Sequence, residues 1–299
     1  MGACPNCKQN AARVRYDFGE QRILRCTACG LLYIDPWPSE AEMHAVYGED
    51  YFQNTAFLNG ASDGLFGYVD YVAERFNKQP QYAAIAREAA ELLGGAERRP
   101  RLLEIGCGFG YFLDVAFEEN FDVAGLEFNP FAVERLRRKY AFPIFSGALE
   151  NTRLEPSAYD AVVMFDVVEH LRDPFSALRQ IHAAMAPGGV LVLSTVDAES
   201  VVSRLIGKRL EDFRRTREHL IFFGRKTMQQ VLQDHGFEVL TMRSIGHTFE
   251  LAFLLARLEL YQRHLFGALR RLLSRVGLGS LQVYLNPRTK MIVFARRAG

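Results

Sequence analysis

Arg101-Leu-Leu-Glu-Ile-Gly-Cys-Gly-Phe-Gly-Tyr111 decides the fold of this chain. The apolar run Leu102–Ile105 predicts a buried strand, and glycines at 106, 108 and 110 end it. An amphipathic helix is predicted over 111–120. Glycine permits a sharp turn and close backbone approach to a ligand, and a helix N-terminus offers unpaired N–H groups. The stretch predicts a nucleotide-type site at the carboxyl end of a parallel strand, although a plain strand-to-helix turn remains the alternative.

The spacing of the glycines separates two kinds of nucleotide site. The dinucleotide fingerprint places its third glycine where this chain has Tyr111. Here the acid Glu104 stands two positions before the first glycine instead. Glu127 is expected at the tip of the second strand, where an acid can accept both hydroxyls of a ribose.

Strand and helix patterns alternate after Pro100, which predicts a parallel sheet covered on both faces. The predicted helices after the ribbon region are 81–93, 131–140, 175–185 and 227–235. Pro187-Gly-Gly189 is expected to end the third of these helices before the next strand. The predicted strands are 102–105, 123–128, 144–146, 161–165, 190–195, 237–242 and 291–295.

Three motifs follow in a characteristic order: Glu127-Phe-Asn-Pro130, Phe165-Asp-Val-Val-Glu-His-Leu171 and Met185-Ala-Pro-Gly-Gly189. Together with the glycine loop they resemble the small-molecule branch of the class I S-adenosylmethionine (SAM) methyltransferases. The resemblance covers roughly residues 100–245 and the last strand. It implies an α/β, Rossmann-like, seven-stranded doubly wound sheet and SAM as cofactor.

The resemblance also implies roles for individual residues. Those around the methionine part of SAM are Glu104, Gly106, Cys107, Gly108 and Gly110, with Cys107 a small loop residue rather than a nucleophile. Glu127 would hold the ribose, Phe128 would lie beside adenine, and the backbone of Leu149 would serve a ring nitrogen. Asp166 and Val167 complete the expected set. At Ala148 the family often has an acid for the adenine amino group, so this chain departs from the pattern.

Two histidines are candidates for the chemistry. His170 follows the fourth predicted strand, and His219 lies in Glu218-His-Leu-Ile-Phe-Phe223, similar to a run that faces the active site in related enzymes. Imidazole titrates near neutrality and can remove a proton from an acceptor hydroxyl. The alternative is that His170 is a structural residue bonded to backbone.

Four of the five cysteines lie near the start of the chain, as Cys4-x-x-Cys7 and Cys26-x-x-Cys29. Two such knuckles can complete a tetrahedron of thiolates, so the segment predicts a zinc ribbon with a structural Zn²⁺. Two disulfides or a redox pair are the alternatives. Ser39 is expected to cap a short helix over 40–47.

Length and charge set the remaining bounds. The chain has 299 residues, 49% hydrophobic content and a formal charge of +1, which gives no global case for nucleic acid or an anionic membrane. The absence of a signal segment favours a cytoplasmic location. The predicted domains are 1–48 (zinc ribbon and linker helix), 49–97 (helical lid or connector, with Tyr68 and Tyr71), 98–246 (core), 247–286 (helical insert) and 287–299 (last strand).

Two segments leave their partners open. Residues 201–217 are basic and could be a solvated face or a rim for an anionic substrate. The insert around 250–275 is apolar with basic residues spaced along it, and it could pack on the core, form a homodimer or contact a membrane. The favoured function is methyl transfer to an O or C atom of a sugar, quinone-like or lipid-linked acceptor. An RNA methyltransferase that uses the ribbon to bind nucleic acid is the alternative.

Overall fold

The computed structural model describes residues 2–47, 51, 74–95, 98–259 and 262–299. Tyr68 and Tyr71, predicted in a helical lid, lie outside the described residues. Among the helices described, none is long and apolar enough to cross a membrane.

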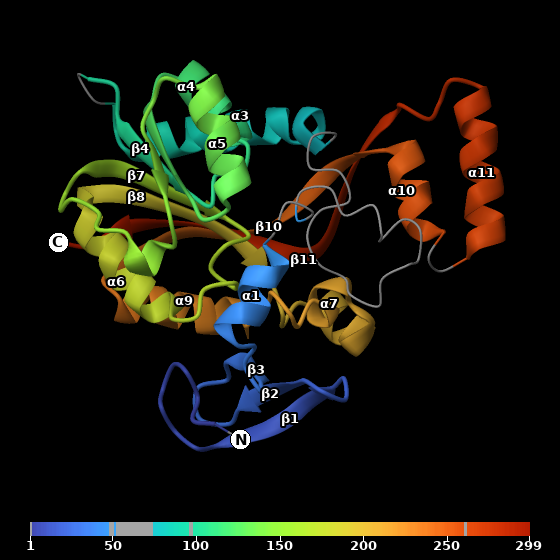
Figure 1. Cartoon of the computed structure of the whole chain (residues 1–299), viewed down its shortest axis with the longest axis horizontal. Coiled ribbons are helices and arrows are strands. Elements are labelled where there is room, and N and C mark those ends of the chain that lie inside the picture. The colour runs from blue at the N-terminus through green and yellow to red at the C-terminus, as the bar shows by residue number, and fades with distance from the viewer. Residues whose placement is uncertain (1, 48–50, 52–73, 96–97, 260–261) are drawn as a thin grey trace.

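A seven-stranded sheet forms the centre of the protein, as predicted (Figure 1). Its order is β10-β11-β8-β7-β4-β5-β6, and β11 runs antiparallel to both β8 and β10, whereas the pairs from β8 to β6 are parallel. Carboxyl ends of parallel strands meet at one edge, so the loops after β4, β5 and β7 are neighbours. The strands are β4 (Arg101–Ile105), β5 (Asp122–Glu127), β6 (Ile144–Ser146), β7 (Tyr159–Phe165), β8 (Met185–Val196), β10 (Phe237–Glu250) and β11 (Gln282–Arg297).

Helices cover both faces of this sheet (Figure 1). Because successive side chains of a strand point to opposite faces, Leu102 packs in one apolar cluster and Leu103 in the other. The first cluster contains residues of α3 (Glu74–Leu92), α4 (Tyr111–Glu118) and α5 (Pro130–Lys139). The second contains residues of α6 (Pro174–Ala184) and α9 (Arg225–Asp234).

Helix α3 lies where a lid or connector was expected. Ile85, Ala86 and Ala89 are buried in the first cluster, and the helix contacts α4 and β10. It therefore forms part of the layer that covers the sheet.

Three strand predictions were wrong in extent. β8 begins at Met185, so Pro187–Gly189 lies inside the strand and not in a turn, and Tyr159 already pairs with Met185. β10 and β11 continue beyond the sheet as an antiparallel pair that reaches Glu250 and Gln282. Among its described residues, the predicted insert 247–286 is thus helical only in α10 (Leu251–Leu258) and α11 (Arg263–Arg275). We call residues 246–289 the β10–β11 arm; it carries both helices away from the core (Figure 1).

The N-terminal ribbon has a sheet of its own, in the order β1-β2-β3-β9. β1 (Ala12–Asp17), β2 (Arg22–Cys26) and β3 (Leu32–Asp35) come from the ribbon, but β9 (Ile221–Phe222) comes from the chain that follows the core strand β8. α1 (Glu40–Val46) has Ser39 as its N-cap, with a capping box. Between β8 and β9 lie α7 (Val201–Ile206), a 3₁₀ turn and α8 (Glu211–Arg214). The ribbon and the core therefore share one continuous apolar cluster.

Candidate functional site

A cavity of about 380 Å³ opens at the carboxyl edge of the sheet, beside the loops after β4, β5 and β7. This volume lies in the range of small-molecule sites. Helix α1 also contributes, through Met43 and the following Tyr47. Eight of the predicted cofactor residues line it: Gly106, Gly108, Glu127, Phe128, Ala148, Leu149, Asp166 and Val167.

The glycine loop adopts backbone that side chains would disturb. Gly106 has φ +72°, and a Cβ at this position would lie 2.5 Å from Cγ2 of Val167. L-residues rarely adopt positive φ, and no Cβ tolerates such a contact. The loop after β4 therefore packs directly on the loop after β7, which closes the floor of the cavity.

Glu127 lies at the tip of β5, as the sequence predicts. The backbone N–H groups of Gly108 and Asn129 donate to its two carboxyl oxygens, at 2.7 and 2.8 Å. Burial raises its pKa, and these backbone bonds act in the opposite direction. Each carboxylate oxygen has two lone pairs, so Glu127 keeps acceptor capacity toward the cavity that it lines.

Three predicted cofactor residues do not line the cavity. Glu104 is buried beneath the loop, where a hydrogen bond to the backbone of Leu113 ties it to the first turn of α4, while its Oε2 has no hydrogen-bond partner among the described residues. Burial raises its pKa well above the usual range. Cys107 is buried against Gly125, and Gly110 faces Leu136 of α5.

Ala148, where the methyltransferases that this chain resembles often have an acid, lies at the wall of the cavity. Ala148 precedes a 3₁₀ turn, Leu149–Asn151, and this turn lines the cavity together with Phe128. Glu150 and Asn151 supply the polar side chains there. The set of a glycine cradle, a ribose-type acid and an aromatic wall with neighbouring polar groups fits SAM.

His170 lines the same cavity. Its Nδ1 lies 2.8 Å from the hydroxyl of Tyr47. The backbone of Tyr47 is held in turn, because Asn129 Nδ2 donates a hydrogen bond to its carbonyl oxygen. Burial lowers the pKa of His170 to about 3, aided by the nearby Arg215, whereas a hydrogen bond to the Glu218 backbone acts in the opposite direction. A hydrogen bond that raises the pKa of a histidine is one that the ring donates, so the backbone group of Glu218 is its carbonyl. The ring of His170 therefore donates to this carbonyl through Nε2, and its Nδ1 accepts from the hydroxyl of Tyr47.

His219 does not line the cavity. It is buried, with its ring edge-on to His170 at a centroid distance of 4.7 Å. Its Nδ1 lies 3.1 Å from the carbonyl oxygen of Asp212 and therefore donates to it. Burial lowers its pKa well below the usual value. The neighbouring Leu220 donates to the Glu169 carbonyl and accepts from the N–H of Ile34 in β3, so the backbone of the ribbon is linked to the site in two steps.

Charged side chains surround the two histidines. Ligand atoms of Glu169, His170 and His219 lie within 4.8 Å of one another, a spacing that could hold a metal ion. The chain supplies its own cation nearby, because Lys290 of β11 lies 2.7 Å from Asp166. Asp166, Asp212 and Glu169 together raise the pKa of Lys290.

Sequence reasoning did not find Tyr47 or Lys290 as site residues. Tyr47 ends a helix assigned to the ribbon linker, and Lys290 lies in the last strand, far from His170 along the chain. Neither carries a local motif. The basic run 201–217 was expected to be either a solvated face or a rim for an anionic substrate. None of its residues is among those that line the cavity, which include Arg172, and Arg215 pairs with buried Glu218 at 3.1 Å.

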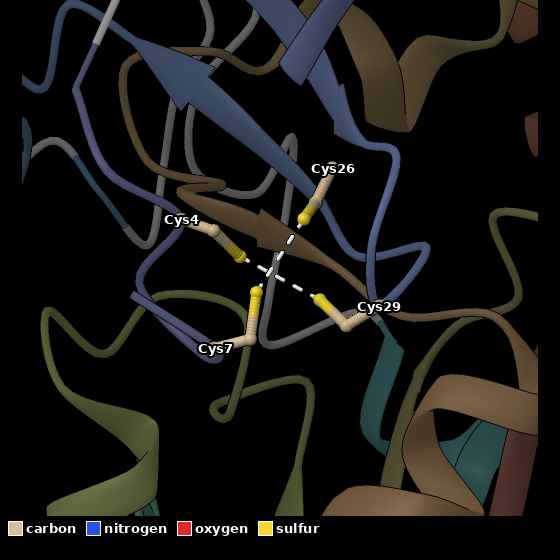
Figure 2. Close-up of side chains that lie close together, drawn as sticks. All are labelled: Cys4, Cys7, Cys26 and Cys29. Carbon is tan, nitrogen blue, oxygen red and sulfur yellow. Dashed lines mark hydrogen bonds between the residues drawn. The ribbon is translucent and has the colours of Figure 1, made fainter. Parts of the chain in front are cut away.

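The four N-terminal cysteines point toward a common centre (Figure 2). Their sulfurs lie 3.6 Å apart for Cys4 and Cys29 and 3.5 Å apart for Cys7 and Cys26. A disulfide needs about 2.05 Å, whereas a tetrahedron with Zn–S bonds of about 2.3 Å has edges of about 3.8 Å. The arrangement fits a four-thiolate metal site with no open coordination position.

The comparisons with known proteins agree with this geometry. Residues 75–242 match the family described as a methyltransferase domain. The chain is 30% identical over 157 residues to a probable SAM-dependent methyltransferase of Mycolicibacterium smegmatis, covering 52% of this chain and 59% of that protein. It is 33% identical over 123 residues to a malonyl-[acyl-carrier protein] O-methyltransferase of Serratia marcescens, covering 40% and 48%. The chain spans about half the length of the curated relatives it matches.

Solved structures show the same fold. A phosphoethanolamine N-methyltransferase 2 of Haemonchus contortus in complex with SAM has a TM-score of 0.55 at 15% identity, covering 90% of this chain and 63% of that one. A protein of Bacillus halodurans described as a methyltransferase has a TM-score of 0.53 at 14% identity, covering 74% and 100%. The chain belongs to the methyltransferase domain family, and the predicted class I, Rossmann-like SAM methyltransferase fold is confirmed.

Proposed function

We propose that this protein transfers a methyl group from SAM to an oxygen atom of a small molecule. Family membership supports the reaction class. The observation that carries the choice of oxygen is the hydroxyl of Tyr47, which lies 2.8 Å from the acceptor nitrogen of His170 at the cavity wall. The hydroxyl of Tyr47 donates a hydrogen bond to the neutral imidazole of His170. We propose that the hydroxyl of a methyl acceptor makes the same contact.

The residues around the glycine loop would hold the cofactor. Glu127 would accept from the ribose hydroxyls, Phe128 and the turn at Leu149 would hold adenine, and Gly106 and Gly108 would let the backbone approach the methionine part. SAM, when bound, supplies a methyl group on a positively charged sulfur, which the acceptor oxygen attacks. The protein must align that oxygen with the methyl group and take up its proton.

His170 is the residue we assign to the proton. Transfer of the methyl group from the sulfur of SAM to the acceptor oxygen would make the acceptor hydroxyl strongly acidic. A weak base is then sufficient, and the low pKa of His170 keeps its Nδ1 unprotonated at neutral pH. His219 supports the ring of His170 from the side and has its own Nδ1 held by Asp212, so we assign it a positioning role.

The acceptor class follows from the cavity and the relatives. The wall combines aromatic side chains (Tyr47, Tyr51 and Phe128) with charged ones, most of them acidic. The charged residues that line it are Glu127, Glu150, Asp166, Asp173 and Arg172. Relatives include a ubiquinone biosynthesis O-methyltransferase of Aliivibrio fischeri, 30% identical over 104 residues, which cover 32% of this chain and 44% of that protein. These features support a quinone-like, sugar or lipid-linked hydroxyl compound as acceptor.

We also propose that the four cysteines bind a structural Zn²⁺. Nucleic acid is a less suitable partner for the ribbon, because two of its arginines already pair within the chain. Arg22 lies 3.2 Å from Asp35, and Arg25 lies 2.7 Å from Glu199 of the core. Arg22 thus pairs within the ribbon, and Arg25 helps to dock the ribbon on the methyltransferase core.

Transfer of labelled methyl groups tests the proposed reaction. The protein is incubated with methyl-labelled SAM and fractionated metabolite extracts, and labelled products are analysed for methyl ethers or esters. His170→Gln is expected to lower kcat by about 10²- to 10⁴-fold, with the Kd for SAM unchanged by calorimetry. A pH profile then separates loss of the base from a change in binding.

His264→Gln is the matched control, because it makes the same substitution at an exposed histidine of α11 that does not line the cavity. It should retain most of the kcat of the wild type. Equal kcat for His170→Gln and wild type at saturating acceptor would exclude His170 as the base. Label found only on nitrogen or carbon would refute transfer to oxygen.

A further inference from the structure

We infer that α11 docks the protein on a membrane surface that carries anionic lipids. The inference rests on an exposed apolar stripe, on the charge of the segment that contains it, and on its position at the end of the β10–β11 arm (Figure 1).

The stripe consists of Leu265, Leu269, Leu272 and Val276. Their exposed fractions are 61%, 38%, 57% and 59%. Residues of an α-helix are offset by about 100°, so positions 265, 269, 272 and 276 fall within about 60° of one another. Gly267, which is buried, lies on the opposite side of the helix. The apolar stripe of α11 therefore faces away from α10, and among the described residues nothing buries it.

The apolar surface continues past the end of the helix. Leu278, Leu281 and Tyr284 are exposed as the chain returns into β11. An exposed surface of this kind marks an interaction site on a folded protein. Side chains scattered singly would need no explanation, but these lie on one helix and the segment that follows it.

The charge of the segment indicates what it binds. Residues 260–299 contain no aspartate and no glutamate, although the whole chain has a formal charge of only +1. Arg263, Arg271 and Arg275 are exposed on α11, and Arg288 is exposed on β11. Arg270, in contrast, is held by Glu259 of the α10 side at 2.6 Å. Exposed arginines beside an exposed apolar stripe are typical of a helix that lies in the interface of an anionic bilayer.

A second copy of the chain fits this surface less well. A symmetric dimer pairs the same patch with itself. Contact through the stripe would bring Arg271 and Arg275 against their own copies, with no carboxylate side chain in residues 260–299 to balance them. Anionic headgroups would balance these arginines while the acyl region receives the leucines.

The arm makes this contact compatible with the fold. β11 pairs with β8 only from Lys290 to Arg296. Residues 247–250 of β10 and 282–285 of β11 therefore pair with each other beyond the part of β11 that contacts β8. Docking through α11 therefore requires no rearrangement of the core. It would hold the cavity near a source of lipid-linked or quinone-like acceptors.

Flotation with vesicles tests the inference on the full-length protein without any methyl acceptor. Vesicles of phosphatidylcholine with about one third phosphatidylglycerol are compared with pure phosphatidylcholine vesicles. We expect binding to the anionic vesicles, and weaker binding at high salt. Leu265→Ser combined with Leu272→Ser should lower the partition coefficient by more than about tenfold. Arg271→Glu combined with Arg275→Glu should lower it by at least about fivefold for each charge removed.

Two matched variants control for nonspecific effects. Leu205→Ser changes a leucine on α7 that is 81% exposed, and Arg138→Glu changes an exposed arginine on α5. Both should bind like the wild type. No flotation, or equal binding to neutral vesicles, would overturn the inference. A dimer seen by light scattering that the leucine variants abolish, without vesicle binding, would assign the stripe to self-association instead. None of these outcomes depends on methyl transfer.

Discussion

Glu169 shows how much the site depends on its surroundings. The residue is only 1% exposed, and neither carboxyl oxygen has a hydrogen-bond partner of good geometry among the described residues. Burial raises its pKa and the neighbouring Asp166 raises it further, against the opposing effects of Lys290 and the Thr195 hydroxyl. An unpaired buried carboxylate is costly. We infer that Glu169 is protonated in the native state at neutral pH.

Glu169→Gln tests this protonation state, because glutamine resembles the neutral acid. Below pH of about 4.3 both the folded and unfolded states hold the proton. As pH rises toward the raised native pKa, the unfolded state loses it first, so the wild type loses stability by up to about 1.4 kcal/mol per pH unit. The variant should show less of this loss. Urea unfolding at pH 5 and pH 7.5 measures the free energy difference.

The control for this variant is Glu118→Gln, on the exposed side of α4. It should leave the pH dependence of the wild type unchanged. If Glu169→Gln is destabilised more at pH 7.5 than at pH 5, the native state holds a carboxylate there and the inference is wrong.

At the scale of elements, the glycine loop after β4 depends on the loop after β7. Gly106 has φ +72°, and a Cβ added to it would collide with the side chain of Val167. Gly95 has φ +74°, and a Cβ added to it would have no described atom within 4 Å. The two glycines have the same backbone requirement and differ in contact. They therefore separate backbone strain from packing.

We predict that Gly95→Ala costs about 1–2 kcal/mol of unfolding free energy, the penalty for a side chain in left-handed backbone. Gly106→Ala should cost more and should weaken SAM binding at least about tenfold, because Val167 must move into the cavity floor. Calorimetry with SAM and denaturant unfolding measure both. Gly106→Ala combined with Val167→Ala should recover part of the affinity. Equal effects of the two single variants would refute the contact.

The sequence predicted these elements because their signals are local. Strand β4, the three glycines and Glu127 lie in one short stretch, 101–127, and each is set by apolar runs and turn residues. The lengths of β10 and β11 were underestimated because the arm pairs strand with strand outside the sheet, so its residues lack a buried run. Tyr47, Lys290 and β9 reach the site through tertiary contacts, which leave no spacing to detect.

At the scale of the whole molecule, the ribbon is part of the core. The N–H of Ile34 donates to the carbonyl of Leu220, and Tyr16 contacts Phe213 at a ring distance of 5.1 Å. Leu24, Ile34 and Phe222 share one cluster with the sheet. Helix α1 then carries Tyr47 from the ribbon to His170.

Metal removal should therefore affect the entire chain. Structural zinc contributes about 10 kcal/mol or more in ribbon-sized sites, and for domains of this order 1 kcal/mol shifts Tm by roughly 2–4 °C. We expect a chelator to lower the single melting transition by at least about 10 °C and to weaken SAM binding. Scanning calorimetry with and without chelator measures this. Re-addition of zinc should restore both properties.

If the chelated protein shows a separate low-temperature transition for the ribbon, and the main transition and SAM affinity stay unchanged, the ribbon is an independent appendage. The shared cluster would then contribute little to stability.

The pairing of β3 with β9 has a consequence for biosynthesis. Residue 32 of β3 pairs with residue 222 of β9, and at about 5–20 residues per second a ribosome needs roughly 10–40 s to make the chain between them. During this interval the edge of β3 that pairs with β9 would remain unpaired, even if the ribbon had already bound its metal. Unpaired strand edges promote aggregation. Slow translation or truncation before residue 221 should therefore yield aggregates rather than a soluble ribbon.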